Sequence, residues 1–159
     1  MKYKQLTKEQ FEELHEEFAQ FLATQQIDAN EWKSIKKDKP TIAEEELNLF
    51  SDVVWEDVLN KTKHLEHFSK QSLNLFKCGV KEISRIVVQV GKPAFDFFND
   101  EDYQWFINNT NDDSIQFFKG TKNYDKERNV ELFDLIQKGS VICDGKLFES
   151  IFKLISYTK

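Results

Sequence analysis

The chain begins with apolar side chains at the spacing of an amphipathic helix. They recur every three or four residues, at Phe11, Leu14, Phe18, Phe21 and Leu22. This period predicts one helix from residue 8 to about residue 24. Thr7 followed by Gln10 is a capping-box pattern, in which each side chain accepts a hydrogen bond from a free backbone N–H of the other residue. The helix is therefore expected to begin just after Thr7.

Two further helices are predicted before residue 62. Asp28 and Glu31 form a second cap, and the short helix that follows runs through "ANEWKSIKK". After Pro40, Thr41 opens a longer helix through "TIAEEELNLFSDVVWEDVLNK". Its apolar arc covers roughly 160° of a helical wheel, wider than the stripe of a surface helix. The arc consists of Ile42, Ala43, Leu47, Phe50, Val53, Val54 and Val58. We therefore expect this helix to be central and covered on more than one side.

After residue 62 the pattern changes to short runs of apolar and β-branched residues, which predict strands. "HLEHFS", "SLNLFKCG" and "EISRIVVQVG" are such runs, and "GVKE" joins the last two as a hairpin. "SIQFFKG" and "SVIC" also favour strands. Helices are predicted through "EDYQWFINN", with Asp100 as cap, through "KERNVELFDLIQKG" up to Gly139, and through "KLFESIFKLI".

Helices first and hairpin strands next predict an α+β fold. We expect an N-terminal helical segment of about three helices, followed by a small, mostly antiparallel sheet with C-terminal helices. Neither a repeat nor a linker-like stretch interrupts the sequence. A single domain over residues 1–159 is therefore expected, helical and acidic over 1–62 and mixed strand and helix over 63–159.

The net charge of −6 is concentrated in the N-terminal segment. Residues 1–62 hold eight lysines and 14 acidic residues, whereas residues 63–159 hold 14 basic and 14 acidic residues. An acidic surface disfavours phosphate backbones and favours basic partners. Fifteen phenylalanines beside five glycines and two prolines indicate an aromatic core and few long loops.

Cysteine usage and hydropathy indicate a cytoplasmic protein. Cys78 and Cys143 lie in apolar runs and form no C-x-x-C pair, as expected of small buried side chains in a reducing cytosol. The start "MKYKQLTKEQ" lacks the apolar core of a signal peptide. No stretch approaches the about 18 consecutive apolar residues of a membrane-spanning helix.

Glu12 and His15 have the E-x-x-H spacing that carboxylate-bridged metal sites use on a helix. Such sites need two of these pairs and further carboxylates, and the chain supplies one pair. On the helical wheel His15 borders the apolar stripe and Glu12 lies further toward solvent. A histidine at the edge of the core is the favoured interpretation.

His64, Glu66 and His67 are the other candidate metal ligands. In a strand, alternation places His64 and Glu66 on one face and His67 on the other, so they cannot share an ion. Only if the long helix continued through residue 67 would the two histidines share a face. We therefore expect neither a metal nor another cofactor.

Catalytic signatures are not found in the sequence. It contains no G-x-S-x-G elbow, no phosphate-binding G-x-x-x-x-G-K-[ST] loop and no G-x-G-x-x-G. The carboxylates of "FDFFNDEDYQW" and "NNTNDDS" favour turns and helix caps. No catalytic residue is predicted, and enzyme activity is disfavoured.

For nucleic acid, the best candidate is the basic segment that surrounds a tryptophan. Lys33, Lys36 and Lys37 lie beside Trp32, so that lysines could contact phosphates and the indole could stack on a base. Solvated lysines beside a core tryptophan are the alternative. "FFKGTKNYDKER" is a second basic cluster, diluted by Asp125 and Glu127.

Several runs resemble an uncharacterised protein family of the Bacteroidota, one of the domains of unknown function. The resemblance rests on residues 1–61 and on "LEHFSKQSLNLFKCG", "YQW" and "LIQKGSVI". It covers nearly the whole chain and implies one intact domain in a cytoplasmic protein of such bacteria. It implies no reaction, ligand or catalytic residue.

The expected function is non-enzymatic protein–protein interaction, as an adaptor or regulator of a larger assembly. The acidic N-terminal segment and the many aromatic residues support this expectation, because aromatic side chains often anchor interfaces. The candidate contact residues are Glu13, Glu16, Glu17 and Glu45. An RNA- or ribosome-associated factor is the alternative, and a metal-dependent enzyme built on His15, His64 and His67 is the third hypothesis.

Overall fold

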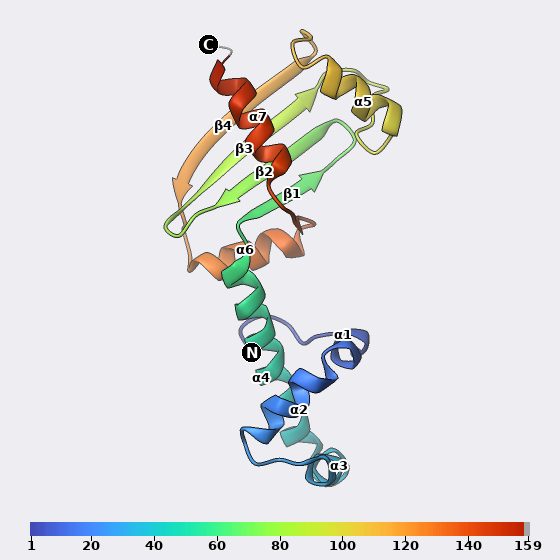
Figure 1. Cartoon of the computed structure of the whole chain (residues 1–159), viewed down its shortest axis with the longest axis vertical. Helices are drawn as coiled ribbons and strands as arrows, with labels where there is room; N and C mark the ends of the chain where they lie inside the picture. Colours follow the sequence, from blue (N-terminus) through green and yellow to red (C-terminus); the bar gives the residue numbers. More distant parts are fainter. Residues whose placement is uncertain (158–159) are drawn as a thin grey trace. The chain divides into compact units, whose positions relative to one another are not determined.

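The computed structural model describes residues 1–157, and the chain divides into two compact units (Figure 1). The N-terminal unit comprises residues 1–60 and the C-terminal unit residues 61–159. The division falls close to residue 62, where the sequence pattern changes. That the two units fold as one domain stays a prediction.

The N-terminal unit is helical. Its helices are α1 (Lys8–Glu13), α2 (His15–Ala23), α3 (Ala29–Asp38) and α4 (Pro40–Lys61), the last of which ends at the border of the unit. The capping box of Thr7 and Gln10 is present, since Thr7 Oγ1 accepts from Gln10 N at 3.2 Å and Gln10 Oε1 accepts from Thr7 N at 2.8 Å. Asp28 caps α3 by accepting from Glu31 N at 2.8 Å.

The single helix predicted over residues 8–24 is wrong at its centre. Leu14 leaves helical geometry with φ −102° and ψ 23°, and it separates α1 from α2. His15 Nδ1 donates to the Glu12 carbonyl oxygen at 2.9 Å. This bond stabilises the break, because a side-chain donor takes the place of a backbone N–H at the end of α1.

Phenylalanine rings form the core of the N-terminal unit. The Phe18 ring lies 5.0 Å from Phe50, 5.7 Å from Phe11 and 5.2 Å from Trp32, measured between centroids. Phe21 also meets Phe50, at 5.4 Å. These contacts join α1, α2 and α3 to α4 through one aromatic cluster.

The prediction that α4 is covered on more than one side is wrong for part of its apolar arc. Ala43 and Phe50 are buried, but Ile42 is 41% exposed and Val53 is 55% exposed. Leu49, outside that arc, is 54% exposed. The reason is that the covering rings of Phe11, Phe18 and Phe21 all meet α4 at Phe50.

The C-terminal unit is built on an antiparallel sheet, which confirms the α+β prediction. Over residues 1–157 the strands are β1 (His64–Phe68), β2 (Ser72–Cys78), β3 (Glu82–Val90), β4 (Ile115–Asn123) and β5 (Val141–Ile142). Their order in the sheet is β4-β3-β2-β1-β5. The hairpin through "GVKE" is confirmed, since Gly79 N donates to the Glu82 carbonyl oxygen at 2.9 Å.

One face of this sheet is covered by α5 (Asp100–Asn108) and α7 (Lys146–Tyr157) (Figure 1). The strands contribute Leu73, Leu75, Ile86, Val88 and Val90 to this core, and the helices contribute Phe106, Phe148 and Ile151. The cap of α5 is Asn99 and not the predicted Asp100, because the Asn99 Oδ1 accepts from Asp102 N at 3.0 Å.

The helix α6 (Arg128–Gln137) lies on the other side of the sheet, at one end. The Arg128 guanidinium donates to the carbonyl oxygens of Thr62 at 2.5 Å, Gly79 at 2.9 Å and Cys78 at 3.3 Å. This anchor holds α6 where β2 ends. Within the described residues, no helix covers most of the face of β3 and β4 that lies opposite α5 and α7.

Candidate functional site

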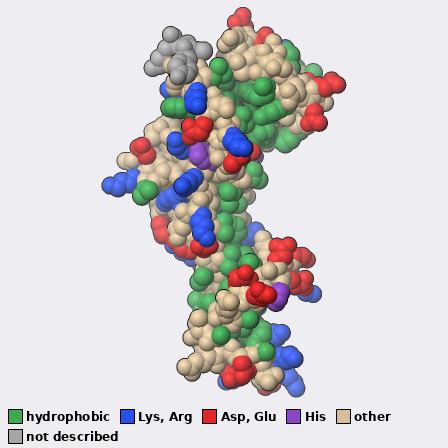
Figure 2. All heavy atoms as spheres, in the orientation of Figure 1, with side chains coloured by type: hydrophobic (Ala, Val, Ile, Leu, Met, Phe, Trp, Pro, Cys, Tyr) green, Lys and Arg blue, Asp and Glu red, His purple; other side chains and the backbone are tan. Residues whose placement is uncertain are grey.

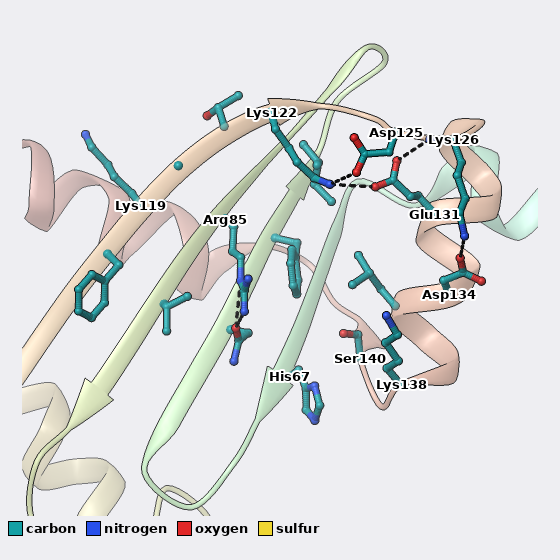
Figure 3. A pocket seen from close by; sticks show the side chains of 18 residues that line it. His67, Arg85, Lys119, Lys122, Asp125, Lys126, Glu131, Asp134, Lys138 and Ser140 are labelled. Atoms are coloured by element: carbon teal, nitrogen blue, oxygen red, sulfur yellow. Dashed lines mark hydrogen bonds and ion pairs between the residues drawn. The ribbon is translucent and has the colours of Figure 1, made fainter.

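A groove lies on the face of the sheet that α5 and α7 do not cover (Figure 3). Alternation along the strands places one set of side chains on this face, and α6 forms a wall from Glu131 to its C-cap Lys138. The floor residues are His67, Asn74, Phe76, Ile83, Arg85, Val87, Phe118, Gly120 and Lys122. The groove has a volume of about 900 Å³. A space of this size holds a small ligand or a short peptide.

The floor of the groove has an apolar part. Phe76 and Ile83 are buried beneath it, and Phe118 is 51% exposed at its rim. A large aromatic ring at the edge of a concave surface is a typical contact point for a partner. The groove therefore offers apolar contact area as well as charge.

Arg85 lies at the centre of the groove and is held by its neighbours. Its Nε donates to Asn74 Oδ1 at 3.1 Å and its Nη2 donates to the same oxygen. The guanidinium also lies 5.6 Å from the centroid of the Phe76 ring. An arginine has five N–H donors, so three remain after these bonds. Within residues 1–157, Arg85 forms no ion pair with a carboxylate.

Gly120 leaves a gap next to Arg85. The two residues are direct cross-strand partners, on β4 and β3. A Cβ added at Gly120 would meet nothing within 4 Å, and Gly120 does not have a positive φ. The backbone therefore does not require glycine here. A glycine inside a strand often marks a place where a ligand or another backbone approaches closely.

The carboxylates of the groove are paired with lysines (Figure 3). Lys122 Nζ lies 2.7 Å from Asp125 and 3.3 Å from Glu131, and Lys126 Nζ lies 3.0 Å from Asp134. The hydrogen bond from Lys122 lowers the pKa of Asp125, and the two carboxylates raise the pKa of Lys122. Asp125 and Lys122 therefore stay ionised at neutral pH.

Cations outnumber carboxylates around the groove by four to three, because the fifth basic residue that lines it, Lys119, turns its side chain to the α7 face of the sheet. Lys138 is exposed, and Lys119 Nζ lies 5.4 Å from the Phe152 ring. Neither forms an ion pair within residues 1–157, and the same holds for Arg85. The groove is thus a positive surface on a chain whose net charge is −6.

The comparison with protein families identifies the chain. It matches the Family of unknown function (DUF6495) over residues 1–156. The chain belongs to this family. No curated protein and no solved structure matches it. The resemblance to a domain of unknown function is thereby confirmed, and membership of the family assigns no activity to the groove.

The histidines and the E-x-x-H pair do not meet. Glu12 contacts His15 through its backbone carbonyl and not through its carboxylate. His64 and His67 lie on opposite faces of β1, as strand alternation predicts. His64 Nε2 is 3.5 Å from Glu149, and His67 lies in the groove. Among residues 1–157, no three His, Cys, Asp or Glu side chains are placed to hold a metal ion.

Neither thiol is activated. Cys78 and Cys143 form no disulfide. Burial raises the pKa of Cys78 to about 12 and that of Cys143 to about 11. Both thiols are therefore protonated at neutral pH, and a protonated thiol is a weak nucleophile.

The acidic residues proposed for partner binding are exposed. They are Glu13, Glu16, Glu17 and Glu45. Figure 2 shows carboxylate side chains gathered over α1 and α2. Glu16 and Glu17 lie in the first turn of α2, where the positive end of the helix dipole stabilises negative charge.

The candidate nucleic-acid segment lies on α3. Lys33, Lys36 and Lys37 are exposed there. The Trp32 ring is half-buried, packs edge-on against Phe18 and lies 5.8 Å from Lys36 Nζ. The indole therefore serves the aromatic core of the N-terminal unit.

Sequence reasoning missed the central residues of the groove. Arg85 stands in "EISRIVVQV" at a position that alternation turns away from the core, but the sequence does not show that this face is open. Phe118 and Gly120 belong to the predicted strand "SIQFFKG" and to the basic cluster "FFKGTKNYDKER", but neither pattern showed that they line a groove. A charged residue on a strand and a glycine on the next strand were the available signals.

No described helix is both long enough and apolar enough to cross a membrane.

Proposed function

We propose that this protein is a non-enzymatic interaction protein, an adaptor or regulator that binds a segment of a partner protein in the groove of its C-terminal unit. The observation that carries the proposal is Arg85, whose guanidinium Asn74 and the Phe76 ring hold over β2 on the open face of the sheet, without an ion pair to a carboxylate among residues 1–157. An oriented guanidinium is well suited to bind a carboxylate. The exposed ring of Phe118 adds an apolar contact.

The partner segment is expected to carry both acidic and apolar side chains. Acidic groups complement the positive excess around the groove, and apolar groups cover Phe118. A continuous phosphate backbone fits less well, because Lys122 and Lys126 are already paired with carboxylates and few cations remain for a run of phosphates. A protein segment is therefore favoured over nucleic acid.

Display of random short peptides tests this proposal. The full chain is panned against the peptide library, and the dissociation constants of the enriched peptides are measured by fluorescence anisotropy. We expect enriched peptides to combine Asp or Glu with apolar residues. Arg85→Glu should weaken their binding by about tenfold or more, because a like charge then faces the peptide.

The matched control is Lys153→Glu, which makes the same change of sign at an exposed position of α7 outside the groove. It should leave the affinity unchanged. Enrichment of peptides without acidic residues, or equal binding by Arg85→Glu and the unchanged protein, would contradict the proposal.

The acidic surface of Glu13, Glu16 and Glu17 is proposed as a second contact area, for a basic partner. Its support is the exposure of these carboxylates on α1 and α2. Reversal of the three charges should weaken the binding of a basic partner found by affinity purification. Unchanged affinity for every such partner would remove this surface from the proposal.

The alternative of an RNA- or ribosome-associated factor has its own test. Binding of RNA through α3 should fall steeply with salt, and Lys36→Glu with Lys37→Glu should abolish that dependence.

We further propose that the protein acts in the cytoplasm of Bacteroidota. The two unpaired cysteines and the quoted sequence resemblance support this location.

A further inference from the structure

The strand β4 forms one end of the sheet, and its outer edge is open. In the strand order, β3 is the neighbour of β4 on one side, and no strand within residues 1–157 pairs with the other side. The strand is nine residues long, and its last six residues are exposed. Such an edge presents unpaired N–H and C=O groups that a further strand can bind.

The register shows which backbone groups point outward. Gly91 N donates to the Ser114 carbonyl oxygen at 2.7 Å, and Tyr124 N donates to that of Lys81 at 3.5 Å. In an antiparallel pair, every second residue turns its N–H and C=O toward the partner strand. The even-numbered residues of β4 therefore bond to β3. The residues that turn these groups outward are Phe117, Lys119, Thr121 and Asn123.

The lysines of β4 do not guard this edge. Natural proteins often protect an open edge with lysine side chains that project past it. Here Lys119 lies against the Phe152 ring at 5.4 Å, and Lys122 is drawn to Asp125 and Glu131. Both side chains are thus held over the two faces of the sheet, and the backbone edge stays accessible.

We infer that the partner segment binds as an additional strand on the outer edge of β4, beside the groove. This inference rests on the proposed function and specifies how the segment binds. The occupant is an extended segment of a partner protein that presents both acidic and apolar side chains on each of its two faces. Backbone hydrogen bonds supply affinity in this mode, and the alternating side chains supply specificity.

Each face of the added strand would meet one cation and one aromatic ring. On the groove side these are Lys122 and Phe118, and on the α7 side they are Lys119 and Phe152. Neighbouring strands lie about 4.8 Å apart, so an added strand would lie about 10 Å from β3. Gly120 places no side chain between the added strand and β3.

Charge also decides against a second copy of the chain as the occupant. Residues Ile115–Asn123 include two lysines and no acidic residue. Two copies of β4 side by side would bring lysines together, and like charges on neighbouring strands are destabilising. An acidic segment gains from the same lysines.

Residue-resolved amide hydrogen exchange tests the inference. The probe is a capped peptide that repeats Glu-Glu-Val-Val, so that each face of the strand carries both residue types, and a peptide that repeats Lys-Lys-Val-Val is the control; each is added to the full chain. The glutamate peptide should slow exchange at the outward amides of Lys119, Thr121 and Asn123. The inward amides of Phe118 and Lys122 should be slow with and without it. The lysine peptide should protect neither set.

A pair of variants at Thr121 gives a second test. Both Thr121→Pro and Thr121→Val remove the hydroxyl that contacts Ser84 at 2.9 Å. Only proline also removes the outward N–H. We expect Thr121→Pro to bind the glutamate peptide about tenfold more weakly than Thr121→Val, since one backbone hydrogen bond is lost and its acceptor is left unpaired. Equal affinities of the two variants, when both are folded, would overturn the inference. If Thr121→Pro does not fold, the exchange experiment still tests the inference, because it uses the unchanged chain.

The outcomes separate the inference from the proposed function. If displayed peptides bind in an Arg85-dependent way but the outward amides stay unprotected, the added strand is wrong and the proposed function stands. If no peptide binds, both fall. The outward amides could also become protected without peptide as the protein concentration rises. That result would overturn the inference, because the occupant of the edge would then be a second copy of the chain.

Discussion

The two units of this protein differ in how they use charge and apolar surface. The N-terminal helices carry the acidic excess of the chain around a cluster of rings, most of which are half-buried. The C-terminal unit is nearly neutral and buries many side chains completely, among them Leu73, Val88 and Phe106. Its sheet has one face under helices and one face that is largely open. The comparison teaches that the groove follows from the unequal cover of a sheet, and not from an excess of charge.

The same comparison bears on stability. Fully burying one large apolar side chain stabilises a fold by about 1.5–3 kcal/mol. The deep core lies between the sheet and the helices α5 and α7. The N-terminal unit places fewer apolar side chains out of contact with water, and it depends more on helix caps and single hydrogen bonds. Four substitutions or titrations test this contrast.

The largest effect is expected in the core of the C-terminal unit. Phe106 is completely buried and meets Phe97 at 5.2 Å. Phe106→Ala should lower the free energy of unfolding by about 3–5 kcal/mol, because it leaves a cavity. Urea denaturation followed by circular dichroism measures this loss.

Its control is Phe118→Ala on the open face, which should change the free energy of unfolding by less than about 0.5 kcal/mol. A loss at Phe118 as large as that at Phe106 would show that the groove is part of the packed core. The contrast between the two faces would then be wrong.

The next largest effect concerns a buried hydroxyl in the N-terminal unit. Ser51 Oγ accepts from Leu6 N at 3.0 Å and donates to the Leu47 carbonyl oxygen at 2.7 Å. Ser51→Ala leaves the Leu6 N–H buried without an acceptor, which should cost about 1–3 kcal/mol. Thermal unfolding measures this cost, and Ser34→Ala at an exposed position of α3 should show almost none. Equal effects of the two substitutions would contradict this assignment.

A smaller effect is expected at the start of α1. Thr7→Ala removes the capping hydroxyl that Gln10 N uses, and this should cost about 1 kcal/mol. Faster amide exchange at Gln10 measures the loss. Thr7→Ser keeps the hydroxyl and should retain slow exchange, so equal exchange in the two variants would exclude a role for the cap.

The smallest effect is a pH dependence of the C-terminal unit. Lys77, and to a smaller extent His64, lowers the pKa of Glu149 below its usual value of 4.5. A lowered carboxylate pKa stabilises the folded state above pH 4.5, and this stabilisation is lost as the pH falls through the folded pKa. Because Glu149 is 43% exposed, the loss should be at most about 0.5 kcal/mol.

Thermal unfolding at pH 7 and pH 3 measures this difference. Glu149→Gln should lose less stability on acidification than the unchanged protein does. Identical losses in the two proteins would show that the ion pair with Lys77 contributes nothing to folding.

Most elements follow from local patterns in the sequence. The alternation of "SLNLFKC" and "EISRIVVQV" predicted the hairpin of β2 and β3, and polar residues before apolar periods predicted the caps at Thr7 and Asp28. The errors are also local in origin. The break at Leu14 depends on one bond from His15 to a backbone carbonyl, and neighbouring Asn99 and Asp100 are equally suitable caps by residue type.

What the sequence by itself determined is the α+β class, the order of the helices and strands, and the acidic character of the N-terminal segment. Periodicity and capping express interactions between residues a few positions apart, so they are visible in one chain. Only the tertiary structure decided that Arg85 lies beside Gly120 and that the outer edge of β4 is open. Strand order and the placement of α6 depend on contacts such as Arg128 with the Thr62 carbonyl, between residues far apart in the chain. Such contacts leave no period in the sequence.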